Sequence, residues 1–152
     1  MVGFKNRYMV VEVNLNPNRD RKTDDPIIIT PYNVAKAIKD SILVNFGNVV
    51  WLLHLGPSKY VNHITKLCII RASRDEYQNV WSAITMVRSI GNFPVSIYLL
   101  DLTGSIKACK NAALKFEELK FGQHKLVAGA HLPADVNKLM QDYLERIKVL
   151  EH

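Results

Sequence analysis

The sequence lacks the residue patterns on which most catalytic and metal sites are built. Its two cysteines, Cys68 and Cys109, are far apart and form no C-x-x-C pair, which excludes a disulfide framework and a cysteine-pair zinc site. None of its five histidines has a second histidine at the spacing of a zinc-ligand pair. The phosphate loops G-x-G-x-x-G and G-x-x-x-x-G-K-S/T and the nucleophile motif G-x-S-x-G are also missing. We therefore expect no catalytic residue, no bound metal and no cofactor.

Long apolar runs and acidic residues are scarce as well. No run reaches the roughly 18 apolar residues that span a bilayer, and the N-terminal stretch MVGFKNRYMVVEV has no signal-peptide core. We expect an intracellular protein with no membrane partner, in which both thiols are free and buried. Asp and Glu number 14 against 20 Lys and Arg, so the net charge is +6. This excess of positive charge favours an anionic partner such as nucleic acid.

The order of periodic segments predicts the fold class. Alternating or β-rich segments indicate strands at residues 7–15, 48–55, 59–72 and 94–103, and helical spacing indicates helices between them and after the last strand. Thr30 with Pro31 starts the first helix and Gly47 ends it. The S-x-x-E sequence at 73–76 predicts a capping box for the second helix, which Gly91 and Asn92 would end.

The resulting order, β-α-β-β-α-β followed by two helices, is the ferredoxin-like arrangement of an α+β protein with an antiparallel sheet. Because the strands are apolar on both sides, we expect both faces of the sheet to be covered, by the C-terminal helices or by a partner. We expect one domain over residues 1–152, with a core at 4–120 and a helical extension at 121–152. Residues 121–133 are ambiguous, because Gly122, Gly129 and Pro133 interrupt them.

Basic side chains are the chemistry that the sequence offers. Strands one and three of this topology are antiparallel neighbours, so the start of the first and the end of the third meet at one end of the sheet. A Gly104–Ser105 turn opens a further helix, whose N-terminus favours anions. We predict RNA phosphate contacts there, with ordinary solvated charges as the alternative, and Arg74 could instead pair with a neighbouring acid. The predicted contact residues are Lys5, Arg7, Arg71, Arg74, Ser105, Lys107 and Lys110.

Two further features qualify this prediction. The RNA-recognition domains that share this topology stack bases on aromatic residues of strands one and three, but here the third strand reads ITKLCIIRA and Tyr8 stands alone on the first. Reading of single-stranded bases across the sheet is therefore not expected. The last helix carries an apolar stripe that must face the chain's own sheet or a partner, and we assign a partner interface to Leu139, Met140, Tyr143 and Ile147.

Four stretches together carry a resemblance to a known family. They are FKNRYMVVEV, ITPYNVAKAIKDSILVNFG, IIRASRDEYQNVWSAIT and TGSIKAC. In this order they resemble the small processing-of-precursor subunit, the fifth of the Pop series, shared by ribonuclease P and ribonuclease MRP. The resemblance spans residues 4–121. Ser105 stands where threonine is frequent in the family, and the tail after Phe121 matches nothing familiar.

The resemblance implies a role in a ribonucleoprotein. It implies a non-catalytic subunit that binds the catalytic RNA, a TIM-barrel protein subunit and other subunits of the particle. Such a particle matures the 5′ end of precursor tRNA and processes precursor rRNA, in the nucleus and nucleolus. Two alternatives remain at this point. One is a protein-only scaffold, and the other is a regulatory ferredoxin-like domain that binds a small molecule, neither with direct RNA contact.

Overall fold

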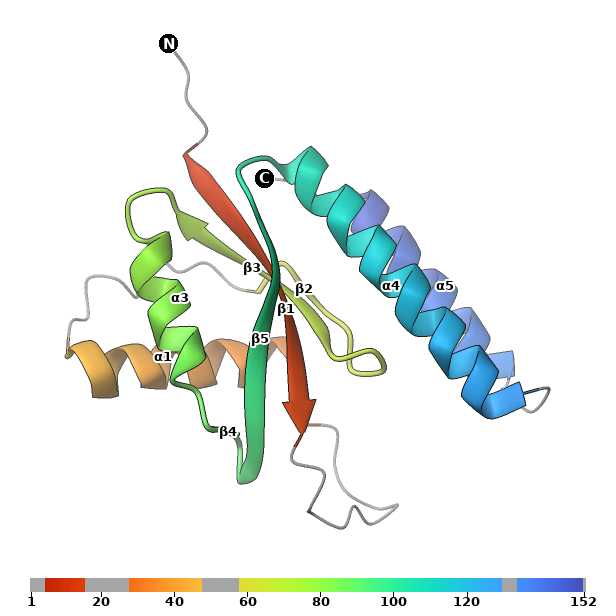
Figure 1. The fold of residues 1–152 in the computed structure, drawn as a ribbon, viewed down its shortest axis with the longest axis horizontal. Coiled ribbons are helices and arrows are strands. Elements are labelled where there is room, and N and C mark those ends of the chain that lie inside the picture. The colour runs from red at the N-terminus through yellow and green to blue at the C-terminus, as the bar shows by residue number, and fades with distance from the viewer. Residues whose placement is uncertain (1–4, 16–27, 48–57, 130–133, 152) are drawn as a thin grey trace.

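A computed structural model describes residues 5–15, 28–47, 58–129 and 134–151. Its strands form one antiparallel sheet in the order β2-β3-β1-β5-β4, and helices lie on both sides of that sheet (Figure 1). The elements are β1 (Asn6–Leu15), α1 (Pro31–Phe46), β2 (Tyr60–Val61), β3 (Leu67–Ser73), α3 (Tyr77–Thr85), β4 (Ser89–Ile90), β5 (Phe93–Thr103), α4 (Ile106–Ala128) and α5 (Ala134–Lys148).

β1 is the central strand, and it pairs antiparallel with β3 on one side and with β5 on the other. Tyr8 lies opposite Arg71 of β3 and opposite Thr103 of β5, so the start of β1 meets the ends of its two neighbours. The predicted pairing of the first and third strands is confirmed. The ferredoxin-like prediction is confirmed as well, with the short β4 added at the edge beside β5.

The ends of α1 are set by local chemistry, as the sequence predicts. The Thr30 side chain accepts a hydrogen bond from the backbone N–H of Asn33 at 3.1 Å, and Pro31 occupies the first turn. Gly47 adopts a left-handed conformation with φ 62°, and its N–H donates to the carbonyl of Leu43. An N-cap such as Thr30 stabilises a helix by about 1 kcal/mol, and Gly47 defines where the chain leaves the helix.

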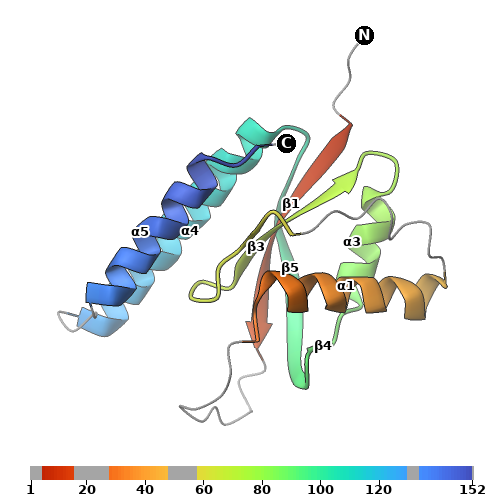
Figure 2. The same cartoon turned by 180° about the vertical axis from the view of Figure 1, so that it is seen from behind.

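One face of the sheet packs on α1 and α3, which Figure 2 shows from behind. Met9 and Val11 of β1 contribute alternate side chains to this first core, together with Ile38 of α1 and Ile84 of α3. Each of these fully buried side chains stabilises the fold by roughly 1.5–3 kcal/mol. The Ser41 hydroxyl donates to the carbonyl of Ala83 at 2.6 Å, which ties α1 directly to α3.

The other face of the sheet packs on α4 and α5, so the prediction that both faces are covered is confirmed. The side chains that fill this second core come from the sheet (Tyr8, Val10, Tyr60, Leu67, Ile69), from α4 (Cys109, Ala113, Phe121) and from α5 (Met140, Tyr143, Ile147). Leu139 packs against the same core. The apolar surface that Leu139, Met140, Tyr143 and Ile147 face is therefore the chain's own, and their assignment to a partner interface is corrected accordingly.

The prediction of one long strand over residues 59–72 is wrong. The chain forms a hairpin there, and its turn runs from Asn62 to Lys66 between β2 and β3. The Asn62 N–H donates to the carbonyl of Leu67 and the Lys66 N–H donates to the carbonyl of Asn62. Lys66 adopts φ 64°, a conformation that a lysine rarely takes and that no sequence pattern announces. The predicted strand at 48–55 lies outside the described residues.

The second helix also differs from its prediction. Ser73 accepts a hydrogen bond from the Glu76 N–H at 3.2 Å, but Ser73 ends β3 and α3 begins only at Tyr77, so the full capping box does not form. Gly91 and Asn92 do not end this helix. Gly91 has φ 60° and makes the turn between β4 and β5, because the helix has already ended at Thr85.

Residues 121–133 are ambiguous in the sequence. The structure shows that they are helical as far as Ala128. α4 continues through Gly122, because a single exposed glycine costs a helix only about 1 kcal/mol. The predicted division at residue 121 therefore falls inside one helix.

Candidate nucleic-acid interface

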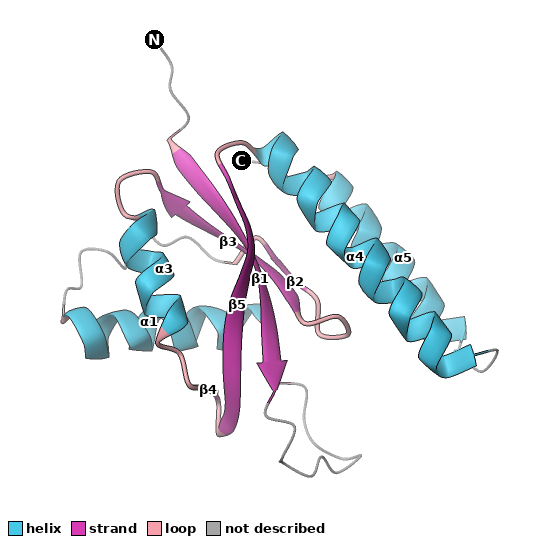
Figure 3. Cartoon of the chain, in the orientation of Figure 1, coloured by secondary structure: helices cyan, strands magenta, loops and turns pink. Residues whose placement is uncertain are grey.

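One end of the sheet gathers the start of β1, the ends of β3 and β5 and the start of α4 (Figure 3). The N–H of Arg74, just after β3, donates to the carbonyl of Lys5, just before β1, at 2.8 Å. Both side chains are exposed. The pairing of β1 with β3 therefore brings Lys5 and Arg74 together at this end of the sheet.

Arg7 joins two elements at this end. Its guanidinium carbon lies 6.0 Å from the centre of the Tyr77 ring of α3, which is the distance of a weak cation–π contact. A Cβ atom on Gly104 would lie 3.6 Å from the Nη1 atom of Arg7, so the arginine also reaches the turn that opens α4. Arg7 is half-buried and its Nη1 donates to the carbonyl of Asn6, which holds the cation in a defined position.

Ser105 caps α4 as predicted. Its hydroxyl accepts a hydrogen bond from the N–H of Ala108 at 3.2 Å, and its backbone is extended. The first turn of this 23-residue helix contains no acidic residue, and it contains the exposed Lys107. The positive end of the helix dipole and Lys107 therefore both favour an anion near this turn, which the Arg7 side chain also reaches.

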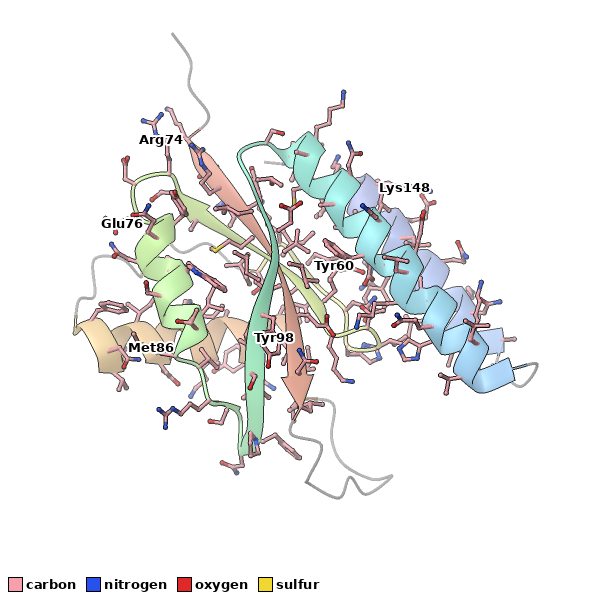
Figure 4. All side chains as sticks on the ribbon, viewed as in Figure 1. Tyr60, Arg74, Glu76, Met86, Tyr98 and Lys148 are labelled. Carbon is pink, nitrogen blue, oxygen red and sulfur yellow. The ribbon has the colours of Figure 1, made fainter. Side chains whose placement is uncertain are left out.

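Arg74 is held only weakly by its neighbours. Its Nε atom lies 4.0 Å from a carboxylate oxygen of Asp75, and both side chains are more than half exposed, so the pair contributes little. The carboxylate of Glu76 accepts a hydrogen bond from Asn79. The guanidinium of Arg74 can therefore turn toward an anion at low cost. Figure 4 shows Arg74 beyond the end of β3.

Arg71 and Lys110, two further predicted contact residues, have other surroundings. Arg71 lies opposite Tyr8 in the sheet, so its side chain points to the α4–α5 face, whereas Arg7 lies opposite Ala72 and points to the α1–α3 face. Burial and the nearby Arg71 charge lower the pKa of Lys59. Lys110 donates to the carbonyl of Lys148 at 3.1 Å, at the end of α5. Contact of Arg71 and Lys110 with RNA stays a prediction.

Glu117, a buried carboxylate on α4, was not predicted from the sequence. Glu117 is fully buried, and its oxygens accept hydrogen bonds from the Tyr60 hydroxyl and the Thr65 hydroxyl at 2.6 Å each, and from the Asn62 amide. These hydrogen bonds fix the β2–β3 turn to α4. A signal was present, because Glu117 interrupts an apolar stripe formed by Cys109, Ala113 and Phe121.

The two thiols are buried and free, as predicted. Burial raises the pKa of Cys68 to about 12, with a smaller contribution from the Glu117 carboxylate. Burial and the Asp101 carboxylate raise the pKa of Cys109 to about 12 as well. Neither thiol is a nucleophile at neutral pH.

Glu117 is expected to make stability depend on pH. Burial raises its pKa, although hydrogen bonds from Thr65, Tyr60 and Asn62 oppose the shift. The folded state therefore binds the proton more tightly than the unfolded chain, so this stabilisation is complete below the ordinary glutamate pKa and is lost as pH rises through the raised value. Urea unfolding at several pH values should give a slope of the unfolding free energy against pH. Glu117→Gln should reduce that slope. An unchanged slope in the variant would contradict the assignment.

The described residues contain neither a candidate metal site nor a candidate membrane-spanning helix. Within the described ranges, no group of three or more His, Cys, Asp or Glu side chains could hold a metal ion. In the same ranges, no helix is both long enough and apolar enough to cross a membrane. The fold and its cationic end together define a ferredoxin-like domain with a surface suited to anions.

Comparison with known proteins places the chain in a family. Its sequence matches the Rpp14/Pop5 family over residues 7–114, so the chain belongs to that family. A relative from Arabidopsis thaliana, named probable ribonuclease P/MRP protein subunit POP5, is 52% identical over 155 residues that cover all of both chains. The Schizosaccharomyces pombe ribonuclease P/MRP protein subunit POP5 is 32% identical over 76% of this chain and 87% of its own.

Two more distant proteins are also similar to this chain. The human ribonuclease P/MRP protein subunit POP5 is 24% identical over 76% of this chain and 72% of its own. Among solved structures, a chain in a cryo-EM structure of yeast ribonuclease MRP is 12% identical with a TM-score of 0.49, over 70% of this chain and 79% of that chain. The resemblance to the fifth Pop subunit is thus confirmed at the level of the family.

Proposed function

We propose that this protein is a non-catalytic subunit of ribonuclease P/MRP that contacts the RNA of the particle through the cationic end of its sheet. One observation carries the RNA contact: Arg7 reaches the turn that opens α4, and the first turn of α4 contains Lys107 and no acidic residue. Membership in the Rpp14/Pop5 family supports the placement in this particle. The chain would thereby support 5′ maturation of precursor tRNA and processing of precursor rRNA.

The proposed contribution is electrostatic. A folded RNA catalyst brings phosphates close together, and positive side chains reduce their repulsion as counterions do. Lys5, Arg7, Arg74 and Lys107 would each contact phosphate oxygens, and the Ser105 turn would offer backbone N–H groups. Because such contacts do not read base edges, the protein would bind by position and shape rather than by sequence. The cleavage itself would belong to the RNA.

Partners and location follow as part of the same proposal. The RNA, a TIM-barrel protein subunit and other subunits of the particle are the proposed partners, and the nucleus and nucleolus are the proposed location. Imaging of the tagged protein together with a nucleolar marker tests the location. The protein-only alternatives lose their main argument, because the apolar second face of the sheet is covered by α4 and α5 of the same chain.

Replacing Lys107 with alanine should weaken RNA binding equally across RNA sequences. Loss of one phosphate contact should also reduce the slope of log affinity against log salt by about one unit. The melting temperature should hardly change, because Lys107 is exposed. RNA binding by purified protein at several salt concentrations measures the slope.

Lys125 offers a matched control, since it is an exposed lysine in the last turn of the same helix. Lys125→Ala should leave affinity and slope unchanged. An equal effect of both variants, or no effect of Lys107→Ala, would reject the phosphate contact and leave Ser105 as a helix cap alone.

A further inference from the structure

A groove lies at the other end of the α1–α3 layer. It has a volume of about 660 Å³ and runs between α1 and the segment that links α3 to β4. α3 separates it from the cationic end, because Arg74 precedes the first residue of this helix and Met86 follows the last (Figure 4). The groove is lined by Lys36, Ala37, Val44 and Asn45 of α1 and by Met86 and Arg88 after α3, among others.

The walls of the groove are fixed by buried contacts. The Ser41 hydroxyl donates to the carbonyl of Ala83, so the last turns of α1 cannot slide along α3. The Asn45 amide donates to the carbonyl and to the hydroxyl oxygen of Ser41, which holds the Asn45 side chain along the helix. The groove is therefore preformed, which lowers the entropic cost of binding a partner.

Apolar side chains line the groove but remain in contact with water. Val44 is 83% exposed and Met86 is 45% exposed, and both line the groove. Methionine is common at surfaces that bind peptides, because its flexible thioether adapts to different apolar partners. An exposed apolar pair inside a groove indicates a site where a protein segment is buried.

The charges at the groove define what kind of segment fits. Lys36 and Asp40 lie in the lining and pair with each other at 3.3 Å on the solvent side. Arg88 also lines the groove, and within the described ranges no carboxylate lies within salt-bridge distance of its guanidinium. The groove thus combines an apolar surface with one cation that no described acid neutralises.

We propose that this groove binds a segment of a partner protein that presents an apolar side chain to Val44 and Met86 and a carboxylate to Arg88. An RNA strand fits less well, because its phosphate backbone has no apolar group to cover Val44 and Met86. Protein and RNA would then bind at opposite ends of α3 without competing for the same residues. The inference depends on the surface of the chain and on its having a protein partner, and it does not depend on the RNA contact at the cationic end.

A photo-crosslinking experiment tests the proposal in the assembled particle. The photoreactive residue p-benzoylphenylalanine replaces Val44, the particle is purified and irradiated, and mass spectrometry identifies the attached chain. The expected result is a crosslink to one protein segment that carries an acidic residue close to the attachment point. A crosslink to RNA, or no crosslink in intact particles, would overturn the proposal.

A charge reversal provides the second measurement. Arg88→Glu should weaken association with the crosslinked subunit by roughly tenfold, and reversing the partner's carboxylate to lysine should restore it. Lys39→Glu is the matched control, because Lys39 is an exposed cation of α1 outside the groove lining. Equal effects of the two variants, or full association of Arg88→Glu, would also overturn it. RNA affinity should stay unchanged in Arg88→Glu, which separates this result from a failure of the RNA contact.

Discussion

Replacing Glu117 with alanine should destabilise the protein by roughly 3–5 kcal/mol, because three buried donors lose their acceptor at once. The Tyr60 and Thr65 hydroxyls and the Asn62 amide all donate to this carboxylate, and the carboxylate itself is fully buried. Alanine also leaves a cavity between α4 and the β2–β3 turn. Urea unfolding followed by circular dichroism measures the loss, which is a large part of the stability of a small domain.

The neighbouring Glu118 supplies the control for this prediction. Glu118 is exposed on the same helix, so Glu118→Ala should change stability by no more than about 0.5 kcal/mol. The variant Glu117→Gln should fall between wild type and alanine, because an amide oxygen still accepts a hydrogen bond. Equal effects of the two alanine variants would show that the buried hydrogen bonds contribute little.

Removing residues 135–152 should leave a chain that is unfolded or only marginally stable. The deletion takes Met140, Tyr143 and Ile147 out of the second core, and each is at most 5% exposed. Losing three buried side chains removes about 4–9 kcal/mol, which is comparable with the whole stability of a domain of this size. The expected result is an aggregated or unfolded product. A soluble truncated chain with an unchanged melting temperature would contradict the role of α5 as the cover of this core.

Point variants in α5 and just after it give a graded form of the same test. Ile147→Ala should cost about 2–5 kcal/mol, because the side chain is fully buried between α5 and the sheet. Val149→Ala should have almost no effect, because Val149 is 71% exposed. Similar losses from both variants would mean that burial does not determine the effect.

Local chemistry explains what the sequence predicts correctly. The caps at Thr30, Gly47 and Ser105 depend on groups within a few residues of one another, so their spacing is enough to locate them. The element order, together with the known pairing of ferredoxin-like strands, places β1 beside β3. These features follow from short-range physics and from connectivity.

Long-range geometry explains what the sequence does not predict. Arg7 and Arg71 lie near one end of the sheet, but which face each of them occupies depends on strand register, and no local pattern fixes that register. The turn at Lys66 is stabilised by its pairing in a hairpin, although its residues read as part of a continuous strand. The partners of Glu117 are more than 50 residues distant along the chain.

The alternation of β1 between the two cores has a consequence for cooperativity. Tyr8 and Val10 enter one core, and Met9 and Val11 enter the other, so neither core can assemble unless the same strand is in register for both. The α1–α3 layer and the α4–α5 layer should therefore melt in one two-state transition rather than as separate units. Native-state hydrogen exchange should then give the central amides of β1 the highest protection in the molecule, equal to global unfolding. A destabilising substitution in either helical layer should therefore favour unfolding of the cationic end and of the groove alike.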